Sequence, residues 1–129
     1  MSLLNYNWGN IKDERTVSPG EYEIQLKGIE EKTSKKGDPM LESRFTILNE
    51  ADTRPIFHYT MLPAESDDED IVNGKLRRLR EFLIALGSDM SGEIDTEGLV
   101  GSTCFAILKE EEDAEFGARN NISRFIARR

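Results

Sequence analysis

Two adjacent lysines stand at the tip of a tight turn that the sequence predicts between two strands. Lys35 and Lys36 lie in the segment TSKKGDPML, residues 33–41, and Gly37 follows them directly. Ammonium groups at a loop tip can contact phosphate oxygens, which is the chemistry that a nucleic-acid ligand requires. The alternative is an ordinary surface turn whose charges stay in water. The elements that hold the turn, and the side chains beside it, decide between the two.

The charge of the chain is acidic overall but unevenly distributed. The 129 residues carry a formal net charge of −8, which argues against a surface that coats nucleic acid at every point. Ten of the 25 acidic side chains lie in two short runs, residues 65–70 (ESDDED) and 110–115 (EEEDAE), and without them the net charge becomes +2. The rest of the surface therefore has enough positive charge for a basic groove.

Alternation of apolar and polar residues predicts three strands in the first half of the chain. They cover residues 20–32, 39–49 and 54–62, and short turns join them into an antiparallel meander. The alternation of the first strand changes phase at Gly28, which predicts a bulge or a sharp bend there.

A helix and two further strands follow. Apolar side chains at helical spacing predict a helix over about residues 74–86, with Asn73 as its N-cap and Gly87 as a left-handed C-terminal residue. The predicted buried stripe consists of Leu76, Leu79, Phe82, Leu83 and Leu86. Residues 101–111 and 120–127 predict the fourth and fifth strands, with Cys104 in the core and an acidic loop over residues 111–119 between them.

This order of elements predicts a mainly β protein, an OB-fold-like five-stranded barrel with one α-helix between strands three and four. We expect residues 1–18 to form an N-terminal arm and residues 19–129 to form the OB-fold-like domain. An OB-fold binds its ligand on strands two and three and the loops that join strands one to two and four to five. The first of these loops is the turn TSKKGD, residues 33–38, which we call the lysine turn.

Four phrases carry a resemblance to a known family: PGEYEIQLKGIEEKTSKKGDPML, LRRLREFLIALG, GLVGSTCFAILKEEE and ARNNISRF. In this order they resemble a family of phage proteins long described only as a domain of unknown function. Its members are taken to be OB-fold single-stranded-DNA-binding proteins. The family's recurrent features correspond here to Trp8, Gly20, Tyr22, Lys35, Gly37, Gly87, Gly101, Arg119 and Arg124.

The resemblance implies a protein that coats single-stranded DNA during phage replication or recombination, without strong sequence preference. Phage or host replication proteins are the further partners that it implies. Such a protein needs cations along the phosphates and flat side chains on which bases stack. The candidate DNA-binding residues are Lys32, Lys35, Lys36, Arg44, Arg54, Tyr59, Phe116, Arg119 and Arg124. A solvated surface position is the alternative for each of the cations.

The aromatic residues have two alternatives each. The apolar ring of Phe57 favours the core, whereas Tyr59 has a hydroxyl to satisfy and suits either face of the third strand. Phe116 either closes one end of the barrel or stacks on bases. We expect Trp8 to pin the arm to the barrel. For the basic cluster of Lys75, Arg77, Arg78 and Arg80 we expect a solvated helix face or pairing with residues 65–70, and the alternative is a second DNA surface.

Residues suited to catalysis or metal binding are not organised into a site. His58 and Cys104 are single, and residues 65–70 do not fit the spacing of a calcium-binding EF-hand loop. We therefore expect a protein that is not an enzyme, with no catalytic residue, metal or cofactor. The first residues lack the pattern of a signal peptide, and apolar runs are short, so we expect a cytoplasmic protein with no membrane partner. The oligomeric state is left open, homo-oligomers included.

The two acidic runs support an alternative function. An OB-fold module could use them to bind a basic protein or to mimic nucleic acid. Acidic runs on the face opposite the basic groove would favour DNA binding, whereas acidic side chains that fill the groove would favour the alternative.

Overall fold

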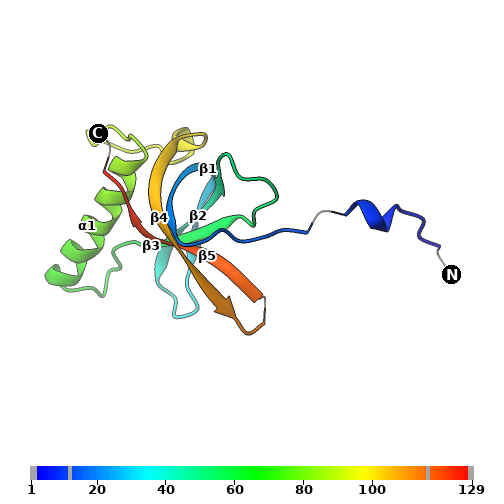
Figure 1. The fold of residues 1–129 in the computed structure, drawn as a ribbon. Coiled ribbons are helices and arrows are strands. Elements are labelled where there is room, and N and C mark those ends of the chain that lie inside the picture. The colour runs from blue at the N-terminus through cyan, green and yellow to red at the C-terminus, as the bar shows by residue number, and fades with distance from the viewer. Residues whose placement is uncertain (1–2, 12, 116, 128–129) are drawn as a thin grey trace.

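The computed structural model describes residues 3–11, 13–115 and 117–127. Five strands form one antiparallel sheet in the order β3-β2-β1-β4-β5. They are β1 (Gly20–Thr33), β2 (Pro39–Ile47), β3 (Ile56–Met61), β4 (Thr103–Asp113) and β5 (Gly117–Phe125). The helix α1 (Glu69–Ala85) follows β3, and the short 3-10 helices η1 (Trp8–Asn10) and η2 (Glu97–Leu99) lie in the arm and before β4. The predicted mainly β architecture with one α-helix is confirmed (Figure 1).

The sheet is open between its two edge strands. No ladder of backbone hydrogen bonds joins β3 to β5 in the described residues, so the predicted barrel is not confirmed. Side chains bridge the two strands instead. The rings of His58 and Phe125 lie 5.0 Å apart between centroids, and Arg54 Nη1 donates a hydrogen bond to the Ala118 carbonyl oxygen at 2.7 Å.

The phase change at Gly28 is a bulge, as predicted. The register of β1 against β2 shifts between Leu26 and Gly28, so β1 bends at this point. β1 pairs with β4 through residues 20–25 and with β2 through residues 24–33. The bend therefore lets one long strand serve both halves of the sheet.

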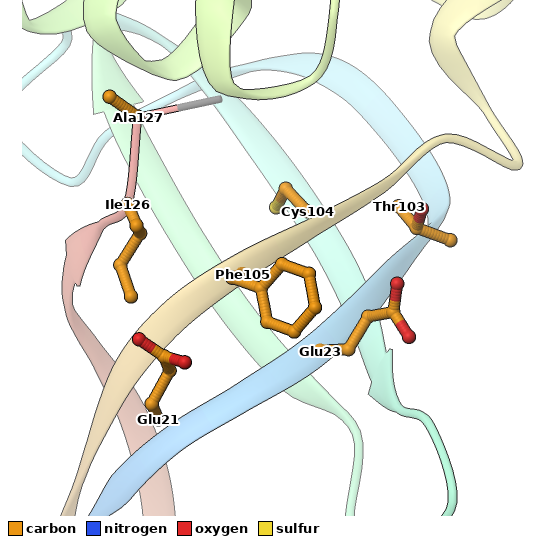
Figure 2. Close-up of a pocket in the computed structure, with 7 residues that line it drawn as sticks. All are labelled: Glu21, Glu23, Thr103, Cys104, Phe105, Ile126 and Ala127. Atoms are coloured by element: carbon orange, nitrogen blue, oxygen red, sulfur yellow. The ribbon is translucent and has the colours of Figure 1, made fainter. Parts of the chain in front are cut away.

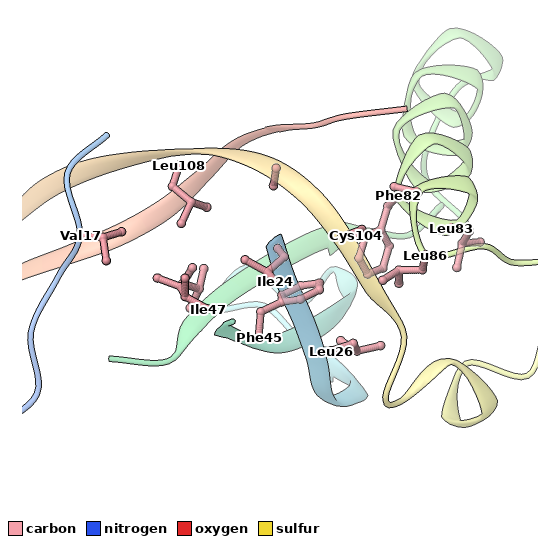
Figure 3. Close-up of a cluster of buried hydrophobic side chains, with 13 residues drawn as sticks. Val17, Ile24, Leu26, Phe45, Ile47, Phe82, Leu83, Leu86, Cys104 and Leu108 are labelled. Atoms are coloured by element: carbon pink, nitrogen blue, oxygen red, sulfur yellow. The ribbon is translucent and has the colours of Figure 1, made fainter. Parts of the chain in front are cut away.

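One hydrophobic cluster holds the sheet and the helix together (Figure 3). Phe45 of β2 and Phe82 of α1 meet edge to face, with ring centroids 6.4 Å apart. Complete burial of side chains of this size stabilises a fold by roughly 1.5–3 kcal/mol each. Cys104 is buried in the same cluster, as predicted.

The helix begins earlier than predicted. Its N-cap is Asp68, whose Oδ1 accepts a hydrogen bond from the backbone N–H of Ile71 at 3.0 Å, so the prediction of Asn73 as the cap is wrong. Acidic side chains stabilise the first turn of a helix, and the acidic run supplies both the cap and that turn. Gly87 has a φ of 84°, as its predicted C-terminal role requires. Leu76 is exposed, so the buried stripe is narrower than predicted.

The predicted acidic loop over residues 111–119 is wrong for most of its length. β4 continues to Asp113 and β5 begins at Gly117, so the two strands form a long hairpin. Glu111 is paired with Arg119 in the register, and Asp113 Oδ2 lies 3.8 Å from Arg119 Nη1. Charges of opposite sign across the ladder allow so acidic a segment to remain a strand.

The N-terminal arm is anchored at residues 15–17. Arg15 forms an isolated parallel bridge with Thr53, and the backbone N–H of Val17 donates to Asn120 Oδ1 at 2.9 Å. Trp8 is 59% exposed and contacts the ring of Tyr6, 5.5 Å away, so the prediction that Trp8 pins the arm to the body is wrong. Arg15 and Val17, which are closer to β1, anchor the arm instead. No helix in the described ranges is long and apolar enough to cross a membrane.

Candidate nucleic-acid interface

The outer surface of β1, β2 and β3 carries aromatic rings and cations in neighbouring rows. Directly paired residues of antiparallel strands point to the same side of a sheet. The rows across the three strands are Gly28–Arg44–Phe57, Glu30–Glu42–Tyr59 and Lys32–Met40–Met61. We call the group of Lys32, Glu42, Arg44, Phe57 and Tyr59 the aromatic face; all but the half-buried Glu42 are exposed.

The two rings of the aromatic face are exposed to a similar extent. Phe57 is 44% exposed and Tyr59 is 51% exposed, whereas Ile56 and Thr60 of the same strand are buried. The prediction that Phe57 belongs to the core is therefore wrong. Alternation gives the inner positions of β3 to Ile56, His58 and Thr60, and the ring of His58 packs on Phe82 and Phe125 there.

A groove of about 670 Å³ lies beside the aromatic face, between β3 and β5. Phe57 and Tyr59 line it from β3, and Asn121 lines it from β5. Its charged lining consists of three cations and two acids: Arg54, Lys109, Arg119, Glu14 and Glu111. We call it the β3–β5 groove. Its cations and rings occur side by side, as a ligand with phosphates and bases requires.

Tyr59 belongs both to the aromatic face and to the lining of the β3–β5 groove. Burial raises its pKa first, and the charge of Glu42 and a hydrogen bond to it raise the pKa further. The nearby charges of Lys32 and Arg119 act in the opposite direction on the pKa of Tyr59, so both cations lie within electrostatic range of its hydroxyl. Lys32 Nζ forms an ion pair with Glu42 Oε1 at 2.9 Å, and that hydrogen bond raises the pKa of Lys32. Tyr59 thus stays protonated between a cation of β1 and a cation of β5.

A second hollow of about 680 Å³ continues from Tyr59 toward α1 and the end of β5. His58, Tyr59 and Ile122 line both hollows, so the two adjoin along the open edge of the sheet. Arg124 of β5 and Arg78 of α1 line the second one. The predicted residue Arg124 therefore lies in the hollow next to the one that Arg54 and Arg119 line.

The lysine turn lies just beyond Lys32. Backbone hydrogen bonds of 2.8 Å and 2.9 Å, from Ser34 N–H to Asp38 and from Gly37 N–H to Ser34, close the turn, and Gly37 has a φ of 90°. Lys35 and Lys36 are exposed, and no ion pair involves either of them in the part of the chain that the structure describes. In Figure 1 the cyan β1–β2 turn and the orange β4–β5 hairpin both extend toward the bottom of the view.

Five of the nine predicted DNA-binding residues therefore gather on the aromatic face and the β3–β5 groove. They are Lys32, Arg44, Arg54, Tyr59 and Arg119. Arg124 lines the adjoining hollow, and Lys35 and Lys36 follow the end of β1. The ninth, Phe116, lies outside the described residues.

A smaller hollow of about 390 Å³ lies over β1 and β4, with Ile126 and Ala127 at one side (Figure 2). Phe105 is 47% exposed there, and Glu21 and Glu23 of β1 line the same hollow. No cation of the described residues lines it. We call it the β1–β4 hollow. Its carboxylates would repel a phosphate backbone, so it is a poor site for nucleic acid.

Comparison with known protein families gives one match. A family model described as "Protein of unknown function (DUF669)" matches residues 4–114, from the arm to the end of β4. The chain belongs to the DUF669 family. A comparison with curated proteins found no match.

Sequence reasoning missed several residues of the groove in this DUF669 member. Lys109 Nζ lies 3.0 Å from Glu111 Oε1, and Asn121 Nδ2 donates to Glu111 Oε2 at 2.6 Å. The hydrogen bond from Lys109 is the first cause that lowers the pKa of Glu111. The predicted fourth strand, residues 101–111, already placed Lys109 and Glu111 on one face, but its sequence does not show that this face borders a groove between β3 and β5.

The two acidic runs of the DUF669 chain have different places. In the first run, Asp68 caps α1, and Asp67 Oδ2 accepts hydrogen bonds from Lys75 Nζ at 2.6 Å and from the Ala64 N–H at 2.8 Å. Pairing of the basic helix cluster with this run, one of the predicted alternatives, is confirmed for Lys75. The second run lies on the β4–β5 hairpin and contributes Glu111 to the groove.

Proposed function

We propose that this DUF669 member binds single-stranded DNA along the aromatic face and the β3–β5 groove, without strong sequence preference. The observation that carries the proposal is the pair of exposed rings, Phe57 and Tyr59, among the cations of three strands. The protein would act as a binding module without catalysis, in DNA replication or recombination of the phage type, in the cytoplasm of the host cell.

Stacking supplies the contact with the bases. Phe57 and Tyr59 are two residues apart on β3, so their Cα atoms lie roughly 7 Å apart on the same side of the strand. Each base–ring stack contributes about 1–3 kcal/mol to single-strand binding and tolerates any base. Bases of a duplex are already stacked on each other, so these rings favour single strands.

Cations supply the contact with the phosphates. Arg44 lies beside the rings, Arg54 and Arg119 line the groove, and Lys32 leads to the lysine turn. Release of counterions from DNA makes such contacts sensitive to salt. Lys32 is already paired with Glu42, and salt weakens that ion pair as well, so Lys32 should add less to the salt sensitivity than an unpaired cation does.

An OB-fold-like barrel, partly open between β3 and β5, is part of the proposal. It is supported by the five antiparallel strands, the helix between β3 and β4, and the His58–Phe125 and Arg54–Ala118 contacts across the open edge. The β3–β5 groove lies along this open edge. Because side-chain contacts and not a backbone ladder span the edge, room for a ligand remains there.

The test is fluorescence anisotropy with a labelled oligothymidine, at low and moderate salt, with labelled duplex as the comparison. We expect binding to the single strand that weakens with salt, and little binding to the duplex. The variant Lys35→Glu/Lys36→Glu should bind more weakly if the turn follows the DNA backbone. Absence of single-strand binding at low salt would contradict the proposal.

A protein-interaction module, or a nucleic-acid mimic, is the second candidate. Three acids of the β4–β5 hairpin favour it, because Glu110, Glu112 and Glu115 are exposed on a projecting element. Under this alternative, changing the three to Gln abolishes binding of a basic partner, such as polylysine, at moderate salt. Under the DNA-binding proposal, the same variant retains or improves its affinity for oligothymidine.

A further inference from the structure

The N-terminal arm exposes an uncharged, largely apolar segment. Between residues 3 and 11 the chain carries no charged side chain. Its large hydrophobic side chains are all exposed: Leu3, Leu4, Tyr6, Trp8 and Ile11. Exposed apolar groups gathered in one short segment mark an interaction site more often than isolated ones do.

A groove of matching character lies on α1. It has a volume of about 630 Å³ and lies between the helix and the loop that follows it. Its lining consists of Asn73, Leu76, Arg77, Leu79, Arg80, Leu83, Met90 and Ile94. We call it the α1 groove. Leu76 and Met90 are exposed at its surface, so this face of the helix has apolar area that the chain itself leaves uncovered.

The charges of the α1 groove suit the arm. Among the described residues that line it, Arg77 and Arg80 are the charged ones. Guanidinium groups stack favourably on the rings of Trp and Tyr, and the arm offers Trp8 and Tyr6.

The arm leaves the body of the molecule on the side away from its own α1. Its anchor is Arg15, whose N–H donates to the Asp52 carbonyl oxygen at 2.8 Å. From Arg15 to Trp8 the chain can extend at most about 25 Å. Figure 1 shows the arm leaving the body on the side opposite α1. In this arrangement the arm presents its rings to another molecule and not to its own α1 groove.

We propose that the arm of one molecule docks in the α1 groove of a second copy of this chain, with Tyr6 and Trp8 between Leu76, Met90 and the two arginines. Each copy carries one arm and one groove, so two copies can exchange arms in a closed dimer, or successive copies can form a chain. This inference does not depend on DNA binding, and its test is carried out without DNA.

The first measurement is sedimentation equilibrium of the full chain over a wide range of protein concentration. We expect the mean mass to rise with concentration. The variant Tyr6→Ala/Trp8→Ala and the variant Leu76→Ser/Met90→Ser should each weaken this association at least tenfold, with unchanged circular dichroism. A monomer at every concentration would overturn the proposal, and so would association that both variants leave unchanged.

The second measurement locates the contact by disulfide cross-linking. An Asn7→Cys copy and an Asn73→Cys copy, distinguished by a tag and mixed under mild oxidation, should form a mixed disulfide, because Asn7 lies between the two rings and Asn73 lines the α1 groove. Ile84→Cys is the matched control, because Ile84 is exposed on the same helix but does not line the α1 groove. Equal cross-linking of Asn7→Cys to either position would show that the arm has no preference for the groove and would overturn the proposal.

Discussion

The β3–β5 groove and the β1–β4 hollow each expose aromatic side chains on the outer surface of the same sheet. Phe57 and Tyr59 are 44% and 51% exposed, and Phe105 of the β1–β4 hollow is 47% exposed. Each hollow thus offers a ring to a ligand, and exposure of the rings does not distinguish them. The difference lies in the charges beside the rings.

Arg54, Lys109 and Arg119 line the β3–β5 groove, whereas Glu21 and Glu23 line the β1–β4 hollow. A phosphate backbone is attracted to the first surface and repelled by the second, whatever the total charge of the molecule. The net charge of −8 therefore says less about nucleic-acid binding than the distribution of the charges does.

The largest effect should come from removal of the rings of the aromatic face. Phe57→Ala/Tyr59→Ala removes two base stacks of about 1 kcal/mol or more each, so single-strand affinity should fall about 30-fold or more. Both rings are exposed, so the folded state should survive with little change. Anisotropy titration with oligothymidine measures the loss, and thermal unfolding checks the fold.

Phe105→Ala is the matched control, because it removes a ring of nearly the same exposure from the acidic hollow. We expect it to leave oligothymidine affinity within about twofold. An equal loss of oligothymidine affinity in Phe105→Ala and in Phe57→Ala/Tyr59→Ala would mean that DNA does not prefer the β3–β5 groove to the β1–β4 hollow.

The next effect concerns a single phosphate contact. Arg119→Gln removes one cation of the groove, and its ion pair with Asp113 is long, at 3.8 Å, and partly exposed, so stability should change little. Affinity should fall several-fold, and the slope of log affinity against log salt should decrease by about 1. Titrations at four salt concentrations measure the slope.

Arg80→Gln serves as the control for charge alone, because Arg80 lies on α1 and does not line the β3–β5 groove. Its salt slope should match that of the unchanged protein. If Arg119→Gln and Arg80→Gln alter the slope equally, binding depends on total charge and not on the groove.

The strands were predictable because alternation reports them directly. Ile24 and Leu26 alternate with polar neighbours in β1, and the phase change at Gly28 is visible without coordinates. The helix start was not predictable in the same way, because Asp68 belongs to a run of acids that resembles a solvated loop. Its capping role is visible only from the hydrogen bond to Ile71.

The cations of the candidate site were easier to predict than its rings. Arg44, Arg54 and Arg119 are polar residues in or beside strands and so point outward. Phe57 was misplaced because an apolar ring suits the core, and only the burial of Ile56 shows which face of β3 is inside. The sequence gives the alternation of a strand, but the packing of α1 decides which side of it is covered.

A smaller effect tests whether charge alone keeps DNA from the β1–β4 hollow. Glu21→Lys/Glu23→Lys places cations beside Phe105 and should add weak single-strand binding, a few-fold at low salt and absent at moderate salt. Anisotropy with the Phe57→Ala/Tyr59→Ala background isolates the new site. Affinity equal to that of the natural groove would indicate that any exposed ring with cations suffices, and that the shape of the groove adds nothing.

The smallest expected effect is a change in the pH dependence of stability, and it arises from His58 on the inner side of β3. Behind Phe57 and Tyr59 lies His58, packed on aromatic rings, whereas the neighbours of Phe105 on the inner side are the buried Cys104 and Ala106. Burial lowers the pKa of His58. The unfolded chain, with a histidine pKa near 6.5, therefore binds a proton more readily than the folded one as the pH falls.

Stability should accordingly be complete above about pH 6.5 and decline as the pH falls from there through the folded-state pKa of His58. The decline should be smaller in His58→Gln, whose side chain does not titrate, whatever the absolute stability of that variant. Urea unfolding at pH 7 and pH 5.5 measures the difference, in a range above the acid region where Asp67 and Glu111, with lowered pKa values, take up protons. An identical pH dependence in both proteins would mean that His58 is as easily protonated in the folded chain as in the unfolded one. The interior behind the aromatic face would then be accessible to water, and side chains would not close the open edge of the sheet as tightly as the His58–Phe125 contact implies.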